Sequence, residues 1–236
     1  MFTGHYTYLL LNVLTVIFPL ILSFDKKVAF YKKWKYFLPA MGLTALVFLI
    51  WDIWFTKTGV WSFNPDFLLG INLINLPVEE WLFFITVPYA CVFIYECLRC
   101  WFQIRMSGKI AAYISVALAS ILIVVAAINH FRIYTSTTFI LLGVFIMIQF
   151  IIFRNEVLRN FIPAYLIAIL PFFLVNGVLT SNPVVIYNNA ENFGFRIGTV
   201  PIEDLFYGML LVLMNVTFME IFRHGVFARK IKFKFT

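Results

Sequence analysis

The sequence predicts an all-α membrane protein with seven transmembrane helices arranged as a 3+1+3 parallel internal repeat. The first observation behind this prediction is composition, because 63% of the residues are hydrophobic and only 12% are charged, whereas soluble domains carry about 25% charged residues. The second is a series of apolar runs of membrane-spanning length. The third is a similarity between the two halves of the chain. Together these observations predict a single membrane domain over residues 1–236.

The apolar runs follow one another along the whole chain, separated by short polar connections. An α-helix needs about 20 apolar residues to cross a hydrocarbon layer roughly 30 Å thick. Seven runs meet this length, near residues 5–23, 36–56, 77–98, 110–128, 134–153, 161–180 and 201–222. No Lys or Arg precedes the first run, so we expect a permanent span rather than a signal peptide. The connections are too short for a soluble domain, and we expect no β-strand.

Shifting the sequence by 124 residues aligns the second and third runs with the sixth and seventh. "FLPAMGLTALVFLIWD" then lies on "FIPAYLIAILPFFLVN", and "LPVEEWLFF" lies on "VPIEDLFYG". We therefore expect repeat A over residues 5–100, which holds spans one to three, and repeat B over 134–224, which holds spans five to seven. The fourth span, 110–128, is a linker that restores the orientation of the second copy.

The distribution of cations predicts the orientation in the membrane. Short loops rich in Lys and Arg stay in the cytoplasm, and 15 of the 18 cations fall in the connections on one side. These are Lys26, Lys27, Lys32, Lys33, Lys35, Arg99, Arg105, Lys109, Arg154, Arg159, Arg223, Arg229, Lys230, Lys232 and Lys234. Only Lys57, Arg132 and Arg196 lie on the other side. We expect an outside N-terminus and a cytoplasmic C-terminus in the cytoplasmic membrane, with the net charge of +7 attracting anionic lipid and not nucleic acid.

Two pairs of acidic residues begin the third and seventh spans. Glu79 and Glu80 follow Pro77, and Glu203 and Asp204 follow Pro201. Proline suits the first turn of a helix, and acids at a helix N-terminus often only pair with free N–H groups. The duplicated pattern, followed by aromatic residues, favours a functional site because ionisable groups in a membrane are costly.

The surroundings of these acids indicate the chemistry that they can perform. A buried carboxyl group resists ionisation and is then a potential proton donor, and aromatic faces stabilise cations. Together they suit protonation of an alkene through a carbocation. The candidate aromatic residues are Trp81, Phe83, Phe84, Phe206 and Tyr207, each of which is also compatible with simple packing. The apolar loops before each acidic pair can fold back as lids and bury the acids.

Other polar residues give weaker signals. Asp52 and Asn176 are equivalent in the repeat, and either support the acids or hydrogen-bond between helices. Glu96 with Arg99, and Glu220 with Arg223, have the spacing of surface ion pairs on a helix. The three cysteines are interpreted as apolar fillers, and the three histidines do not form a metal-ligand set.

The doubled motif, "PVEEWLFF" and "PIEDLFYG", with the approach sequences "GVWSFNP" and "NFGFRIGTVPIED", resembles the small integral-membrane lycopene cyclases in their fused form. The resemblance implies a lycopene β-cyclase, an isomerase or intramolecular lyase of carotenoid biosynthesis. It implies a lipophilic carotenoid substrate, no tightly bound cofactor, and Glu79, Glu80, Glu203 and Asp204 as the acid and base set. Asp204 departs from the Glu80 pattern by one methylene group, so the two copies can be unequal.

The sequence is also compatible with other functions. A small-solute transporter shares the 3+1+3 plan, but the Pro-Gln pair of such facilitators is absent. A retinal-binding protein needs a lysine within a span, and none of the predicted spans has a buried one. Within the cyclases, a longer carotenoid or a different ring double bond is also compatible with the sequence.

Overall fold

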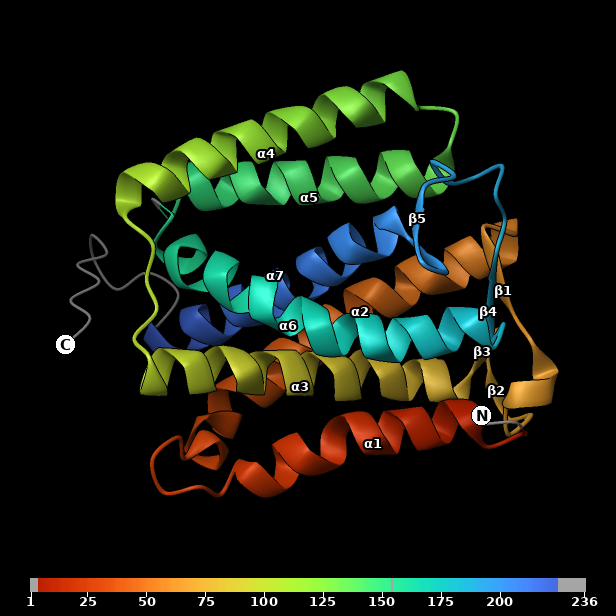
Figure 1. Cartoon of the computed structure of the whole chain (residues 1–236), viewed down its shortest axis with the longest axis horizontal. Helices are drawn as coiled ribbons and strands as arrows, with labels where there is room; N and C mark the ends of the chain where they lie inside the picture. The colour runs from red at the N-terminus through yellow and green to blue at the C-terminus, as the bar shows by residue number, and fades with distance from the viewer. Residues whose placement is uncertain (1–3, 154, 225–236) are drawn as a thin grey trace.

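A computed structural model describes residues 4–153 and 155–224. Arg154, Arg229, Lys230, Lys232 and Lys234, which contribute to the predicted orientation, lie outside the described residues. The described chain forms seven α-helices (Figure 1). They are α1 (Thr7–Leu22), α2 (Trp34–Thr58), α3 (Val78–Trp101), α4 (Gly108–Ile128), α5 (Ile133–Ile151), α6 (Glu156–Ser181) and α7 (Ile202–His224). Each of them coincides with one of the predicted runs.

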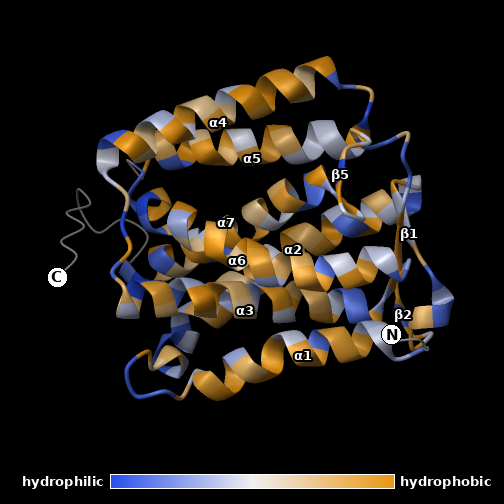
Figure 2. Cartoon of the chain, in the orientation of Figure 1, coloured by the Kyte–Doolittle hydropathy of each residue, from blue (hydrophilic) through white to orange (hydrophobic). Residues whose placement is uncertain are grey.

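The helices have the length and composition of membrane spans, with one exception. Six of those in the described chain are long and apolar enough to cross a membrane. Apolar residues dominate along the helices, and polar residues gather near their ends (Figure 2). Helix α1 is apolar but has only 16 residues, which corresponds to about 24 Å. The predicted helical architecture is therefore confirmed, with six helices in the described chain long and apolar enough to span a membrane. Helix α1 is shorter than the expected span.

Local sequence explains where the two acid-bearing helices begin. Pro77 is the N-cap of α3, with φ −64° and ψ 148°, and Pro201 is the last residue before α7. Both prolines therefore lie just before the first turn, where we expected them within it. The acids occupy the first turn of each helix as expected. Upstream, Gly59 ends α2 in a left-handed conformation (φ 76°), which glycine adopts without strain.

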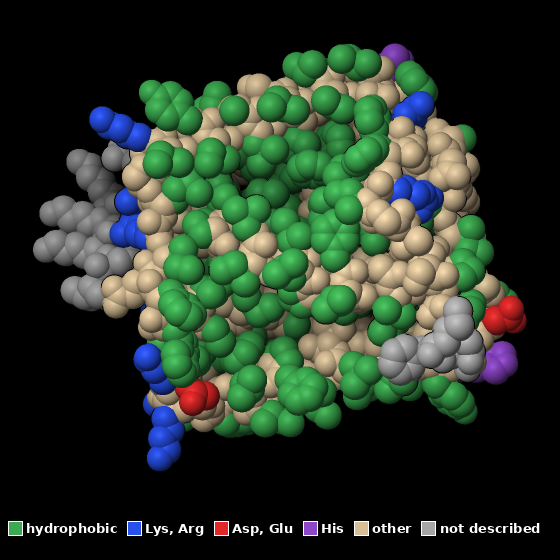
Figure 3. All heavy atoms as spheres, in the orientation of Figure 1, with side chains coloured by type: hydrophobic (Ala, Val, Ile, Leu, Met, Phe, Trp, Pro, Cys, Tyr) green, Lys and Arg blue, Asp and Glu red, His purple; other side chains and the backbone are tan. Residues whose placement is uncertain are grey.

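The helices form one bundle. Helix α2 packs against α7, α1 against α3, and α5 lies between α4 and α7. Helix α6 contacts α3 and α7, and the view in Figure 1 places α4 and α5 along one edge of the bundle and α1 along the opposite edge. Hydrophobic side chains cover much of the face seen in Figure 3, and the Lys and Arg side chains on this face lie at its two ends.

Six short strands lie at the end of the bundle that holds the acids, although the sequence predicted none. Strand β1 (Trp61–Phe63) pairs antiparallel with β4 (Val185–Tyr187). The other strands form two hairpins, β2 (Asn72–Leu73) with β3 (Leu76–Pro77), and β5 (Arg196–Ile197) with β6 (Val200–Pro201). Strands of two or three residues are too short to show an alternating pattern, so the sequence prediction of no strand was wrong.

These strands tie the two loops together over the helix ends. In the β1–β4 pair, Ser62 lies opposite Ile186, which is 124 residues later in the chain. The two hairpins are separated by the same 124 residues. The loops that precede α3 and α7 therefore fold back over the acids and pair with each other.

Candidate active site

A cavity lies beneath the paired strands β1 and β4, among helices α3, α5, α6 and α7. Its empty volume is about 490 Å³, which includes the space that opens to the outside. Its wall is largely aromatic and aliphatic, and two carboxyl groups interrupt it, Glu80 from α3 and Asp204 from α7. Each half of the chain thus contributes one acid to a single cavity.

The two carboxyl groups in this cavity differ in their hydrogen bonds. Glu80 accepts one hydrogen bond among the described residues, from the Tyr8 hydroxyl to Oε2 at 2.5 Å. Asp204 accepts two, from Tyr134 to Oδ1 at 2.6 Å and from Tyr187 to Oδ2 at 2.8 Å. Donated hydrogen bonds stabilise a carboxylate. The arrangement therefore favours the ionised form at Asp204 more than at Glu80.

Tyr187 reaches the cavity from strand β4. Burial raises the pKa of its hydroxyl well above the usual value, and the nearby Asp204 charge adds to the effect, so the hydroxyl remains a donor at neutral pH. Its ring stacks on Tyr134, with centroids 6.0 Å apart, and the Arg196 guanidinium lies 5.7 Å from its centroid. The loop therefore holds this donor in place.

The other two acids, Glu79 and Glu203, face the loops and are not among the residues that line the cavity. Glu79 accepts a hydrogen bond from the backbone N–H of Leu69 at 2.6 Å. Glu203 accepts one from the backbone N–H of Phe193 at 2.6 Å and one from the Thr135 hydroxyl at 2.5 Å. Both side chains are fully buried. The adjacent acids of each pair thus have separate contacts, one to a loop and one to the cavity.

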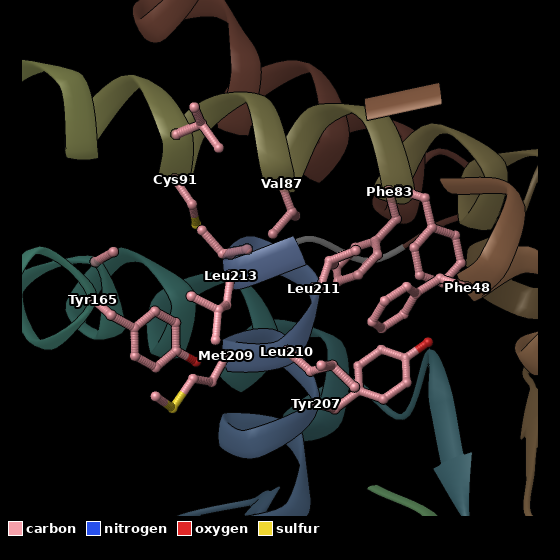
Figure 4. Packing of buried hydrophobic residues seen from close by; sticks show 14 of the residues in the cluster. Phe48, Phe83, Val87, Cys91, Tyr165, Tyr207, Met209, Leu210, Leu211 and Leu213 are labelled. Atoms are coloured by element: carbon pink, nitrogen blue, oxygen red, sulfur yellow. The ribbon is translucent and has the colours of Figure 1, made fainter. Parts of the chain in front are cut away.

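The expected aromatic residues divide between the cavity and the surrounding core. Phe83 and Tyr207 line the cavity, whereas Trp81, Phe84 and Phe206 are not among its lining residues. Figure 4 shows Phe83 and Tyr207 converging with Phe48 from three helices. The Tyr207 hydroxyl is buried with no hydrogen-bond partner among the described residues. Phe84 packs on Phe48, and Phe206 packs on Phe139, with centroids 6.0 and 5.0 Å apart.

The two expected supporting residues also take different positions. Asp52 is fully buried and accepts a hydrogen bond from the Trp61 indole at 2.6 Å. Trp61 in turn lines the cavity, so Asp52, which is not itself a lining residue, holds a lining side chain in position. Asn176 lines the cavity directly, and its amide donates to the Phe172 carbonyl at 3.2 Å.

Comparison with known proteins places this arrangement in a family. A family model described as "Lycopene cyclase" matches residues 5–98 and 131–222, which is most of the chain. The unmatched segment between the two matched parts contains helix α4. The chain belongs to the lycopene cyclase family.

The curated relatives of this lycopene cyclase family member are fungal proteins named "Bifunctional lycopene cyclase/phytoene synthase". That of Colletotrichum graminicola is 40% identical over 49 residues, 21% of this chain and 8% of the relative. That of Neurospora crassa is 36% identical over 59 residues, 25% and 10% respectively. That of Aspergillus oryzae is 27% identical over 110 residues, 43% and 19%. The aligned parts thus cover less than a fifth of these longer relatives. No solved structure matches the chain.

The sequence missed the tyrosines that contact the acids. Tyr8 in α1 and Tyr134 in α5 lie in the first helices of the two expected repeats, but they are 126 residues apart. A comparison at an offset of 124 places neither tyrosine opposite the other. A search that allowed a two-residue gap between the first and second helices of each copy would find this pair.

Two features of the predicted surface ion pairs are wrong: their acids are buried, and the shortest contact of Arg99 is to the other helix. Glu96 and Glu220 are 1% and 4% exposed. Arg99 donates across the bundle to Glu220 at 2.5 Å, closer than its 3.5 Å approach to Glu96 on its own helix. Lys33, in the 3₁₀ turn Phe30–Lys33, also pairs with Glu96. The Arg99–Glu220 contact joins α3 to α7, and the Lys33–Glu96 contact joins the 3₁₀ turn to α3, both at the end of the bundle opposite the acids.

The remaining candidates stay outside the site. Within residues 4–153 and 155–224, no three His, Cys, Asp or Glu side chains come together as metal ligands. Cys91 is buried, and Cys97 and Cys100 are half-buried free thiols. No described contact connects these thiols to Glu80 or Asp204.

Proposed function

We propose that this chain is a lycopene β-cyclase, an isomerase that closes β-ionone rings at the ends of a linear carotenoid. The supporting observation is one largely apolar cavity that holds two carboxyl groups from different halves of the chain. In the reaction, a proton adds to the terminal double bond of the end group, and the neighbouring double bond attacks the cation to close the ring. Loss of a ring proton then restores neutrality. One proton is added and one is removed, so the reaction is redox-neutral and we expect no tightly bound cofactor.

Within this mechanism, Glu80 is the proposed proton donor and Asp204 is the proposed base. Asp204 accepts two tyrosine hydroxyls and Glu80 accepts one, which favours a carboxylate at Asp204 and a neutral acid at Glu80. Enzymes often place a proton donor and a proton acceptor on either side of one substrate. Phe83 and Tyr207 offer ring faces to the cation.

Glu79 and Glu203 belong to the same acid set in a positioning role. Their hydrogen bonds to loop backbone N–H groups hold each lid closed over the cavity. A closed lid excludes water, which would otherwise capture the carbocation. Asp52 supports the same wall through Trp61.

The proposed setting follows from the same features. Repeat A (5–100) and repeat B (134–224) are related by an axis along the membrane normal, with 110–128 as the linker. The N-terminus lies outside the cytoplasmic membrane, so the cavity lies near its outer face. The carotenoid substrate, lycopene, reaches the site from the lipid.

The test is expression of the chain in cells that accumulate lycopene, followed by chromatography of the extracted pigment. Conversion of lycopene to a carotene with β-rings supports the proposal, and the Glu80→Gln variant should leave lycopene linear. If lycopene stays linear while the unsubstituted protein is present in the membrane, the enzymatic proposal fails. The transporter alternative then becomes the stronger one. Supplying a longer linear carotenoid in parallel cells tests the alternative substrate.

A further inference from the structure

A second, larger hollow lies beside the acid cavity, between helices α1, α3 and α6. Its empty volume is about 1000 Å³, about twice that of the cavity. It opens to the outer surface of the bundle, since Leu14, Phe18 and Leu174 line it and are 44%, 66% and 73% exposed. In a membrane this hollow faces the lipid.

This groove and the acid cavity share two wall residues, Phe172 and Asn176. Both lie on α6, and the Asn176 amide donates to the Phe172 carbonyl. The Phe172 ring packs so closely on Gly208 that a Cβ added there would lie 2.7 Å from Cε2. The two hollows are therefore neighbours that share the Phe172 and Asn176 side chains as part of their walls.

The chemistry of the groove suits a hydrocarbon. Of its lining residues, Thr15 and Asn176 carry the hydrogen-bonding side chains. Thr15 already donates to the Leu11 carbonyl at 2.7 Å, and the Asn176 amide is held by α6. A polar solute would lose its hydration there without gaining partners, whereas an apolar chain loses nothing.

Two of the residues that line the groove are prolines within helices. Pro19 in α1 and Pro171 in α6 both line the groove. A proline inside a helix removes one backbone hydrogen bond and favours a bend. Both prolines thus favour a departure from close helix packing at the place where the groove lies.

We propose that this groove binds the extended polyene chain of the carotenoid substrate, while its end group passes Phe172 to reach Glu80 and Asp204. This inference rests on the proposed function. It assigns the two hollows to two parts of one ligand. The cavity takes the reacting end, and the groove takes the unreactive hydrocarbon that remains outside it.

The test narrows the groove without touching the acids. Val175 is half-buried on the α6 wall, and Val175→Phe places a larger ring in the space proposed for the polyene. The matched control is Ala117→Phe on the exposed face of α4. Both purified proteins are assayed in liposomes with lycopene as a varied mole fraction, after thermal unfolding has shown that both are folded.

The expected result is a KM for lycopene that rises about tenfold in Val175→Phe, with kcat within about twofold, because the lost contacts bind the ground state and transition state equally. Ala117→Phe should match the unsubstituted chain. Equal KM values for the two variants would overturn the inference, and this is the result expected if the groove holds only lipid.

A binding measurement separates this inference from the proposed function. In a Glu80→Gln background, lycopene bound in a chiral groove should show induced circular dichroism, and adding Val175→Phe should weaken its binding by a similar factor. If the unsubstituted chain forms no cyclic product, the proposed function fails. If product forms but lycopene binds equally with and without Val175→Phe, only the groove assignment fails.

Discussion

The two hydroxyl groups that donate to Asp204 allow a sharp test of its proposed role. Tyr187→Phe removes one of them, the 2.8 Å hydrogen bond to Oδ2, and keeps the ring that stacks on Tyr134. Among the described residues, Asp204 then retains the hydrogen bond from Tyr134 alone. The carboxylate form is destabilised, so a smaller fraction of the protein carries a base at a given pH.

The size of this effect follows from the charge on the acceptor. A hydrogen bond to a charged group contributes about 1.5–3 kcal/mol, and one pH unit corresponds to about 1.4 kcal/mol. The acid limb of the pH–rate profile reflects protonation of the Asp204 carboxylate as pH falls. Without the Tyr187 hydrogen bond this protonation should occur at a pH that is higher by roughly one to two units. At a fixed pH on that limb, cyclisation should slow by roughly ten- to a hundredfold.

The assay is the initial rate of conversion of lycopene to cyclic carotene in liposomes over a series of pH values. The control is Tyr89→Phe, which removes a hydroxyl bonded to Ser23 at 2.6 Å and to the Trp34 indole at 3.1 Å, away from the acids. An acid limb that stays in place in Tyr187→Phe, or that moves equally in Tyr89→Phe, would refute the assignment of Asp204 as the base.

Further predictions concern the acids and the opposite end of the bundle. Glu80→Gln should slow cyclisation by about 10²- to 10⁴-fold, as expected for loss of a general acid. Glu79→Gln keeps an oxygen that can accept the loop hydrogen bond, so its rate should fall far less. Equal losses of rate in the two variants would contradict the division of roles. Arg99→Leu removes the 2.5 Å contact to the buried Glu220 and should destabilise the protein by about 1–3 kcal/mol, measured as a lower thermal unfolding temperature in detergent. An unchanged unfolding temperature would mean that this contact is dispensable.

The helices could be predicted from the sequence because bilayer thickness constrains their length. Helix α4 was expected at 110–128 and occupies Gly108–Ile128, and α7 was expected at 201–222 and occupies Ile202–His224. Whether the acids are buried could not be predicted from the sequence, because their burial depends on how the preceding loops fold over them. The pairing of β1 with β4 joins segments from the two halves of the chain, and no local pattern in either loop indicates it.

The sequence identified the acids but did not separate the cavity-lining ones from their neighbours. In α7, the lining residues are Asp204, Tyr207, Gly208 and Leu211, which is the i, i+3, i+4, i+7 spacing of one helix face. Glu203 and Phe206 lie off this face. Applying helical periodicity to the motif would have made the distinction, whereas treating all aromatic residues near the acids as equivalent did not.

The antiparallel pair of β1 and β4 has a consequence for how the protein can change over time. The carboxyl groups of the cavity come from opposite sides of this seam, so neither half of the chain holds a complete site that could act as a spare. If Glu80 is the acid and Asp204 the base, as proposed, we expect that a substitution of one is not masked by the intact other. The two copies would then share one reaction between them, and Glu80 and Asp204 would diverge only in complementary directions.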